Sequence, residues 1–210
     1  DRVMCDWFGG RVIEWCDRAR ETGRPFLAGF LTLSSHAPFE VPYDKFADRE
    51  LNAMAFTDEC VGRMIERWKA SPAWDDLLVV LVADHGFPYP KSLVYNEPLR
   101  HRIPMIWTGG ALATPPRAVD EYASQIDLCA TLLGQLGIAH DDFEYSKDIF
   151  APALPKFAYY AFNEGFGVVD ASGHVVYDAA AGRVLDETAP GLLDIGRTML
   201  QTTYVDIGRR

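Results

Sequence analysis

The chain has 210 residues, of which 49% are hydrophobic and 24% are charged, and its formal net charge is −10. This size and composition fit one compact domain with room for a small appendage, and they exclude a disordered chain. The acidic balance comes without a cluster of lysine and arginine among aromatic residues. It therefore argues against nucleic acid and against anionic lipid headgroups as partners.

The sequence contains no apolar run of membrane-spanning length and no signal peptide. It begins with Asp1 rather than methionine, and a helical pattern starts almost at once. We therefore expect a soluble piece of a longer polypeptide, and the missing targeting segment says little about where the parent protein resides.

The first half of the sequence alternates helical patterns with buried strand patterns. Apolar residues at helical spacing predict a helix over 6–20, and Gly23 with Pro25 should end it. The run PFLAGFLTL, residues 25–33, is apolar almost throughout, which is typical of a strand in a parallel sheet covered on both faces. A second amphipathic helix is predicted over 47–70.

Two further strands and one helix follow along the chain. LLVVLVAD, residues 77–84, predicts a buried strand, and IPMIW, residues 103–107, a shorter one. SQIDLCATLLGQLGI predicts a helix that begins at Ser124 with Asp127 in a capping-box-like position, and Cys129 should be a small core residue. This order of elements predicts an α/β fold with a mostly parallel sheet between helices.

The pattern changes near residue 155. Short β-rich runs separated by NEG, ASG and AAG predict an antiparallel meander, and a last helix is expected over about 190–206. We therefore place a boundary between a main α/β part, residues 1–152, and a small α+β subdomain, residues 153–210. Five aromatic residues should pack in the core of the small sheet, with a sugar- or lipid-facing wall as the alternative: Phe157, Tyr159, Tyr160, Phe162 and Phe166.

Chemically useful side chains follow two of the predicted strands. The first strand leads into SSH, residues 34–36, and the second ends in DHG, residues 84–86. Ligands gather at the carboxyl ends of strands in open parallel sheets, and a carboxylate with an imidazole makes about half of a zinc or manganese site. The alternatives are ordinary: Asp84 could cap a helix, His85 could be a half-buried polar ring, and SSH could be a polar turn.

Four segments, taken in order, carry a family resemblance: FLTLSSHAPFEVP, LVVLVADHG, HRIPMIWTGG and SQIDLCATLL. Together they resemble the sulfatase-like catalytic domain of lipoteichoic acid synthases, which are phosphoglycerol transferases of the alkaline phosphatase superfamily. YSKDIF, FNEGFGVVD and LQTTY agree with the end of such proteins. The resemblance implies an alkaline-phosphatase-like sandwich, of which residues 1–152 would be the C-terminal half.

The resemblance also implies roles for individual residues. Asp84 and His85 match the paired metal ligands of the family. His36 matches the histidine of its SH-x-P-F motif, which contacts the substrate phosphate or acts as acid for the leaving group. The metal would be manganese or magnesium, with zinc or calcium used elsewhere in the superfamily.

In this family a Thr or Ser nucleophile and a further acidic ligand lie in the N-terminal half of the domain, which these residues do not contain. We therefore expect the chain alone to be inactive and to need the missing half of its own polypeptide. The exposed sheet edge should make it dimerise. The parent protein would be anchored in the membrane with its catalytic domain outside the cytoplasm.

Three functions remain open from the sequence. The first is transfer of phosphoglycerol through a covalent phospho-enzyme, with an anionic and lipid-linked substrate. The second is hydrolysis of a sulfate or phosphate ester, and the third is a non-catalytic binding domain that keeps the fold. His101 could line the same rim as His36 and Asp84, although a surface-loop histidine is the interpretation we prefer.

Overall fold

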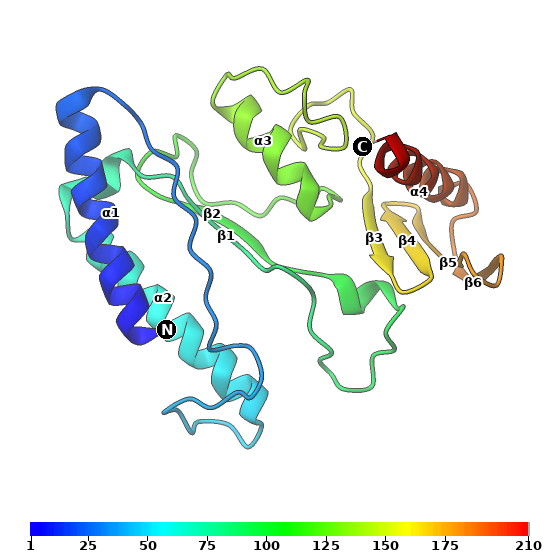
Figure 1. The fold of residues 1–210 in the computed structure, drawn as a ribbon, viewed down its shortest axis with the longest axis horizontal. Helices are drawn as coiled ribbons and strands as arrows, with labels where there is room; N and C mark the ends of the chain where they lie inside the picture. The colour runs from blue at the N-terminus through cyan, green and yellow to red at the C-terminus, as the bar shows by residue number, and fades with distance from the viewer. Residues whose placement is uncertain (210) are drawn as a thin grey trace. The chain divides into compact units, whose positions relative to one another are not determined.

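The computed structural model describes residues 1–209 and divides the chain into two compact units. Unit 1 comprises Asp1–Val80 with Trp107–Pro115, and unit 2 comprises Leu81–Ile106 with Pro116–Arg210. The subdomain boundary expected after residue 152 is a different division, and it stays a prediction. Figure 1 labels the elements of both units.

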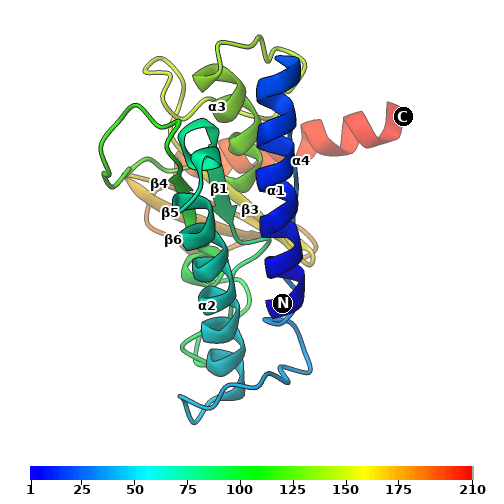
Figure 2. The same ribbon diagram turned by 90° about the vertical axis from the view of Figure 1, so that its left-hand side faces the viewer.

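Unit 1 is built on two long helices, α1 (Arg2–Thr22) and α2 (Arg49–Lys69), which run alongside each other in Figure 1 and Figure 2. Both helices are confirmed by the structure. Asp48 caps α2 by accepting hydrogen bonds from the backbone N–H groups of its first turn. The two helices and the 3₁₀ turn η1 (Pro72–Asp76) share one apolar core.

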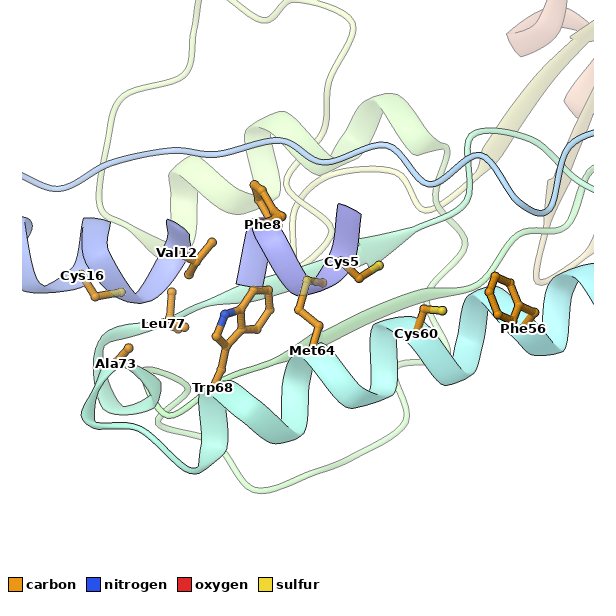
Figure 3. Close-up of a cluster of buried hydrophobic side chains, with 10 residues drawn as sticks. All are labelled: Cys5, Phe8, Val12, Cys16, Phe56, Cys60, Met64, Trp68, Ala73 and Leu77. Atoms are coloured by element: carbon orange, nitrogen blue, oxygen red, sulfur yellow. The ribbon is translucent and has the colours of Figure 1, made fainter. Parts of the chain in front are cut away.

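Figure 3 shows this core, in which Met64 and Trp68 of α2 reach toward α1 and Ala73 and Leu77 come from the segment after α2. The Trp68 indole lies in its middle and donates a hydrogen bond from Nε1 to the Gly9 carbonyl oxygen at 2.9 Å. This bond satisfies the polar atom of a side chain that is otherwise buried among apolar groups. The buried members of the core are Cys5, Phe8, Val12, Cys16, Phe56, Cys60, Met64, Trp68, Ala73 and Leu77.

The strand predicted over 25–33 is not formed in the structure. The segment is extended and its side chains alternate as in a strand: Phe30 stacks on Phe8 at 4.6 Å, whereas Leu27 and Leu31 are 92% and 69% exposed. A strand requires a hydrogen-bonded neighbour, and within residues 1–209 no segment pairs with it. The sequence prediction was therefore wrong about pairing, although the alternation of side chains is that of a strand.

The strands β1 (Val79–Val82) and β2 (Met105–Thr108) confirm the two other predicted strands and form a two-stranded sheet. The backbone N–H of Ala83 donates to the carbonyl of Pro104 beyond one end of the pair, and Ala111 donates to Leu77 beyond the other. The two strands therefore run in opposite directions. Every strand pair within residues 1–209 is antiparallel, so the parallel pairing expected from the sequence is not seen in them. β1 ends directly before the Asp84-His85 pair.

Unit 2 contains η3 (Gln125–Asp127) and α3 (Leu128–Gln135), and the capping box predicted at their start is confirmed. Ser124 N–H donates to Asp127 Oδ2 at 2.8 Å. Asp127 is 1% exposed and also accepts two hydrogen bonds from Lys147 Nζ, at 3.0 and 2.9 Å. Cys129 is exposed, contrary to the sequence prediction, because α3 buries the next two residues instead.

The C-terminal part of unit 2 is an antiparallel sheet covered by one helix, as the sequence predicts. Its strands pair in the order β3-β4-β5-β6, and α4 packs on one face through an apolar cluster centred on Phe166 and Val168. The elements are β3 (Ala158–Phe162), β4 (Gly165–Asp170), β5 (Gly173–Asp178), β6 (Arg183–Glu187) and α4 (Leu192–Arg209).

The five aromatic residues predicted for the core of this sheet divide between its two faces. Phe157, Tyr159 and Phe166 belong to the apolar cluster below α4. Tyr160 and Phe162 instead contact the loop that carries η2 (Pro98–His101).

Among the described residues, no helix is both long and apolar enough to cross a membrane.

The ion pair of Asp127 with Lys147 yields the first prediction. We expect Asp127→Ala to lower the free energy of unfolding by about 3–5 kcal/mol, because it leaves a largely buried ammonium without its carboxylate. Urea denaturation followed by circular dichroism measures the change. Asp142→Ala, at an exposed position, should have little effect. The double variant Asp127→Leu/Lys147→Leu should lose less free energy of unfolding than Asp127→Ala. An equal or larger loss in the double variant would contradict this account.

Candidate metal centre at the end of β1

Asp84 and His85 lie side by side in the turn that follows β1. The His85 backbone N–H donates to Asp84 Oδ1 at 3.0 Å, and His85 Nε2 lies 3.7 Å from Asp84 Oδ2. Both side chains are more than two-thirds exposed. The structure therefore brings the two predicted ligands together on an accessible surface of unit 2.

The hydrogen bonds of His85 select one form of its ring. Nδ1 lies 2.9 Å from the Gly86 carbonyl oxygen, which can only accept a hydrogen bond, so Nδ1 carries the proton. In the neutral ring Nε2 then keeps its lone pair, and this is the nitrogen that faces Asp84 Oδ2. A backbone carbonyl on one ring nitrogen and a free lone pair on the other is the arrangement typical of metal-binding histidines.

Three contacts within unit 2 hold the turn in place. Ala83 N–H donates to the Pro104 carbonyl at 3.4 Å. Gln125 Nε2 donates to the Ala83 carbonyl at 2.6 Å and reaches that of Asp84 at 3.2 Å. Arg100 Nη1 donates to the same Gly86 carbonyl that His85 uses. Side chains from two different segments therefore hold one turn: Gln125 of η3 holds the carbonyls of Ala83 and Asp84, and Arg100 of η2 holds that of Gly86.

Gly86 itself is required by a close approach of two backbones. A Cβ atom added to Gly86 would lie 2.1 Å from the Arg100 carbonyl oxygen, far inside the contact distance. Glycine at this position therefore lets the chain turn tightly behind the two candidate ligands. Arg100 contacts Gly86 both through this backbone approach and through its guanidinium.

The donor set fits a divalent metal in part. The 3.7 Å between His85 Nε2 and Asp84 Oδ2 is shorter than the sum of two metal–ligand bonds of about 2.1 Å, so one ion can reach both atoms. One imidazole nitrogen with one carboxylate oxygen suits manganese or zinc. Within residues 1–209, no group of three or more His, Cys, Asp or Glu residues could hold a metal. The pair can therefore supply two ligands of the usual four or more.

His101 is half-buried rather than the surface-loop residue that we preferred from the sequence. Its ring stacks on Tyr160 of β3 with centroids 4.1 Å apart, and its Nε2 lies 2.8 Å from the Tyr95 carbonyl oxygen. Burial lowers the pKa of His101, the hydrogen bond to Tyr95 opposes this, and the neighbouring Arg100 charge lowers the pKa further. The His101 ring thus joins η2 to the C-terminal sheet.

Tyr160 completes this contact. Its hydroxyl donates to the Asn96 carbonyl at 2.9 Å, and burial raises the pKa of the phenol well above its ordinary value. A Cβ atom at Gly167, on the neighbouring strand β4, would lie 2.0 Å from the Tyr160 ring. The ring therefore lies flat across β4 because Gly167 has no side chain.

His36 lies in an exposed turn of unit 1, so it does not share a unit with Asp84 and His85. Its Nδ1 is 2.8 Å from the Ala37 carbonyl oxygen, which leaves Nε2 as the accessible nitrogen. The preceding residues are anchored, since the backbone N–H groups of Leu33 and Ser34 donate to the Asp1 carboxylate at 2.9 and 3.0 Å. The His36 ring is exposed, and its role toward a substrate stays a prediction.

Sequence reasoning missed Gln125 as a support of the turn. It also assigned no role to Arg100. The only signal for Gln125 was its place inside the SQID capping box, and Arg100 had no signal beyond its position before IPMIW. Both residues act through backbone carbonyls, which carry no residue-specific pattern in a sequence.

Comparison with known proteins identifies the family. The family model described as Sulfatase matches residues 10–138. This chain belongs to the sulfatase family. Members of the family are enzymes that act on anionic sulfate and phosphate esters, and they typically use divalent metal ions. The matched range includes His36, Asp84, His85 and His101.

A relative among characterised bacterial proteins is the lipoteichoic acid synthase-like YvgJ of Bacillus subtilis. The two sequences are 23% identical over 164 residues, which are 64% of this chain and 26% of YvgJ. The chain thus spans about a quarter of the length of this relative.

Solved structures show the fold. A protein of the alkaline phosphatase superfamily from Vibrio parahaemolyticus matches with a TM-score of 0.65 and 23% identity over 88% of this chain and 51% of that one. The lipoteichoic acid synthase LtaP from Listeria monocytogenes matches with a TM-score of 0.67 and 20% identity over 90% of this chain and 56% of that one. The expected α/β fold of this superfamily is therefore confirmed, with the chain spanning about half of each structure.

The contact of Gly86 with Arg100 yields the second prediction. We expect Gly86→Ala to lower the free energy of unfolding, by roughly 1–3 kcal/mol for an overpacked site, and to shift the amide NMR signals of the 83–87 turn. Gly62→Ala is the matched control, because nothing lies within 4 Å of a Cβ atom there. That substitution lies inside α2 and should stabilise by about 0.5–1 kcal/mol. A Gly86→Ala variant with an unchanged free energy of unfolding would contradict the observed approach of the two backbones.

Proposed function

We propose that this chain is the C-terminal part of a metal-dependent phosphotransferase of the cell envelope that resembles lipoteichoic acid synthase. The observation that carries the proposal is the Asp84-His85 pair, exposed at the end of β1 with Nε2 of His85 free to bind a cation. The similarity to YvgJ and LtaP supports transfer of phosphoglycerol from a lipid-linked donor. The site would lie outside the cytoplasm in a membrane-anchored parent.

In this proposal each of the candidate site residues has a defined role. Asp84 Oδ2 and His85 Nε2 hold the metal ion, manganese or magnesium. When bound, the ion lowers the pKa of a coordinated hydroxyl and offsets charge on the ester oxygens. His36, when its ring is protonated on both nitrogens, donates a hydrogen bond from Nε2 to a phosphate oxygen of the substrate or protonates the leaving group. The Thr or Ser nucleophile that takes up the phosphoryl group lies outside these 210 residues.

Hydrolysis of a sulfate ester is the second candidate, and the Sulfatase family model favours it. A metal site of this kind serves both reactions. Which reaction the protein catalyses depends on the ester group it binds and on the acceptor of that group. The intact parent protein distinguishes them when it is given p-nitrophenyl sulfate, bis(p-nitrophenyl) phosphate and a lipid-linked phosphoglycerol donor in turn. Transfer to a glycerol acceptor supports the first candidate, and sulfate release alone supports the second. A parent protein inactive on all three is the result expected for a non-catalytic binding domain.

Metal binding by the chain itself gives the third prediction. We expect Mn²⁺ to broaden the amide NMR signals of residues 83–87 selectively, because the ion is paramagnetic and is held by Asp84 and His85. Asp84→Ala should abolish this selective broadening. Asp120→Ala, an exposed acid of the same unit, should leave it unchanged. Broadening centred elsewhere in unit 2, or unaffected by Asp84→Ala, would overturn the metal assignment.

The same 210-residue chain should release no p-nitrophenol from bis(p-nitrophenyl) phosphate or p-nitrophenyl sulfate, with Mn²⁺ present. It supplies two of the required ligands and no nucleophile in this proposal. Turnover that is lost in Asp84→Ala would show that these residues form a complete active site and would overturn this part of the proposal.

Pairing of the exposed 24–33 segment gives the fourth prediction. We propose that strands from the N-terminal half of the same polypeptide pair with it and that, without them, two copies associate through this edge. Sedimentation velocity at rising concentration should therefore show dimers. Leu31→Lys should weaken the association, whereas Leu136→Lys, at a leucine 57% exposed elsewhere, should not. A monomer at every concentration would contradict the dimer.

A further inference from the structure

The Gly86 carbonyl oxygen is shared by two donors. His85 Nδ1 approaches it at 2.9 Å, and Arg100 Nη1 donates to it from the other segment. A carbonyl oxygen has two lone pairs, so both bonds can be made at once. The carbonyl that selects the ring form of His85 is therefore itself held by a charged guanidinium.

Arg100 is in turn fixed by its surroundings rather than mobile on the surface. Its backbone lies against Gly86, as the 2.1 Å distance of an added Cβ atom shows. It belongs to η2, whose last residue, His101, stacks on Tyr160. Contacts therefore run from the C-terminal sheet through His101 to Arg100 and on to the turn that carries the two candidate ligands.

We propose that Arg100 is a positioning residue for His85: by holding the Gly86 carbonyl it keeps the proton on Nδ1 and leaves Nε2 free for the metal. This inference rests on the proposed function, because a free Nε2 matters only if His85 binds a metal ion. Without the guanidinium, the carbonyl can turn toward water and the imidazole proton can move to Nε2. A ring protonated at Nε2 cannot bind a cation through that atom.

The position of the ring proton provides a test that does not depend on activity. Long-range proton–nitrogen NMR spectra of histidine-labelled chain distinguish a protonated ring nitrogen from an unprotonated one. At a pH above the ordinary pKa of histidine, we expect His85 of the unaltered chain to carry its proton on Nδ1. Arg100→Met, which keeps an unbranched flexible stem but no donor, should move a measurable share of the proton to Nε2.

The neighbouring Arg102 offers the matched control. It is exposed two residues further along, and no contact joins its side chain to Gly86 in the described part of the chain. Arg102→Met removes the same charge and should leave the His85 spectrum as in the unaltered chain. Arg100→Lys, which keeps a donor, should restore part of the Nδ1 form relative to Arg100→Met.

Mn²⁺ titration of the same variants separates this inference from the proposed function. Loss of a group that orients a ligand typically weakens metal binding about 10- to 100-fold, and we expect Arg100→Met to do so while Arg102→Met does not. If Mn²⁺ never broadens the signals around Asp84 and His85 in the unaltered chain, the proposed function fails whatever the ring form. If it does, but Arg100→Met changes neither the ring form nor the affinity, the role of Arg100 is overturned.

Folding of the variants is checked by the amide signals of β3–β6. Arg100→Gln, whose amide group stops short of the Gly86 carbonyl, is a second variant without the guanidinium, and either variant that folds decides the question. If neither folds, the inference is also overturned, because Arg100 would then support the whole unit rather than the His85 ring.

Discussion

The approach of Gly86 to the Arg100 backbone is the constraint on which the candidate site depends. Only a residue without a side chain allows it, since a Cβ atom would come within 2.1 Å of a carbonyl oxygen. Because the two backbones meet there, the Arg100 guanidinium can reach back to the Gly86 carbonyl, and that carbonyl in turn receives Nδ1 of His85. One steric condition thereby sets the path of the turn and, through the Gly86 carbonyl, the ring nitrogen of the candidate ligand His85 that carries the proton.

The C-terminal sheet takes part in this arrangement although it contributes no ligand. Tyr160 lies across Gly167 and stacks on His101, which fixes η2 and with it Arg100. A second connection runs through Ser124, whose Oγ accepts from Tyr159 N–H at 2.7 Å and lies one residue before Gln125. The two residues that hold the turn, Arg100 and Gln125, are thus both tied to β3. A small antiparallel sheet can in this way orient the candidate metal site at the end of another strand.

Local sequence patterns predicted the helices, the meander and the positions of Asp84 and His85, because each depends on residues close along the chain. The capping box at Ser124 is an example, since both partners lie within four residues. The same pattern could not show that Lys147 pairs with Asp127, twenty residues away. The strand predicted over 25–33 failed for a related reason: an apolar run describes side chains, whereas a strand exists only where another backbone accepts and donates its hydrogen bonds.

The two candidate ligands are adjacent in sequence, and this has a consequence for how the site can be assembled. Adjacent residues need only one turn to bring a carboxylate and an imidazole within 3.7 Å, and all the contacts that hold that turn come from unit 2. The pair is therefore organised before any ligand from outside these residues is added. A metal ion bound first by this pair would then bind the remaining ligands. The conformational entropy lost in that second step is smaller, because two of the coordinating side chains are already in place. The direction of assembly would then run from Asp84 and His85 outward.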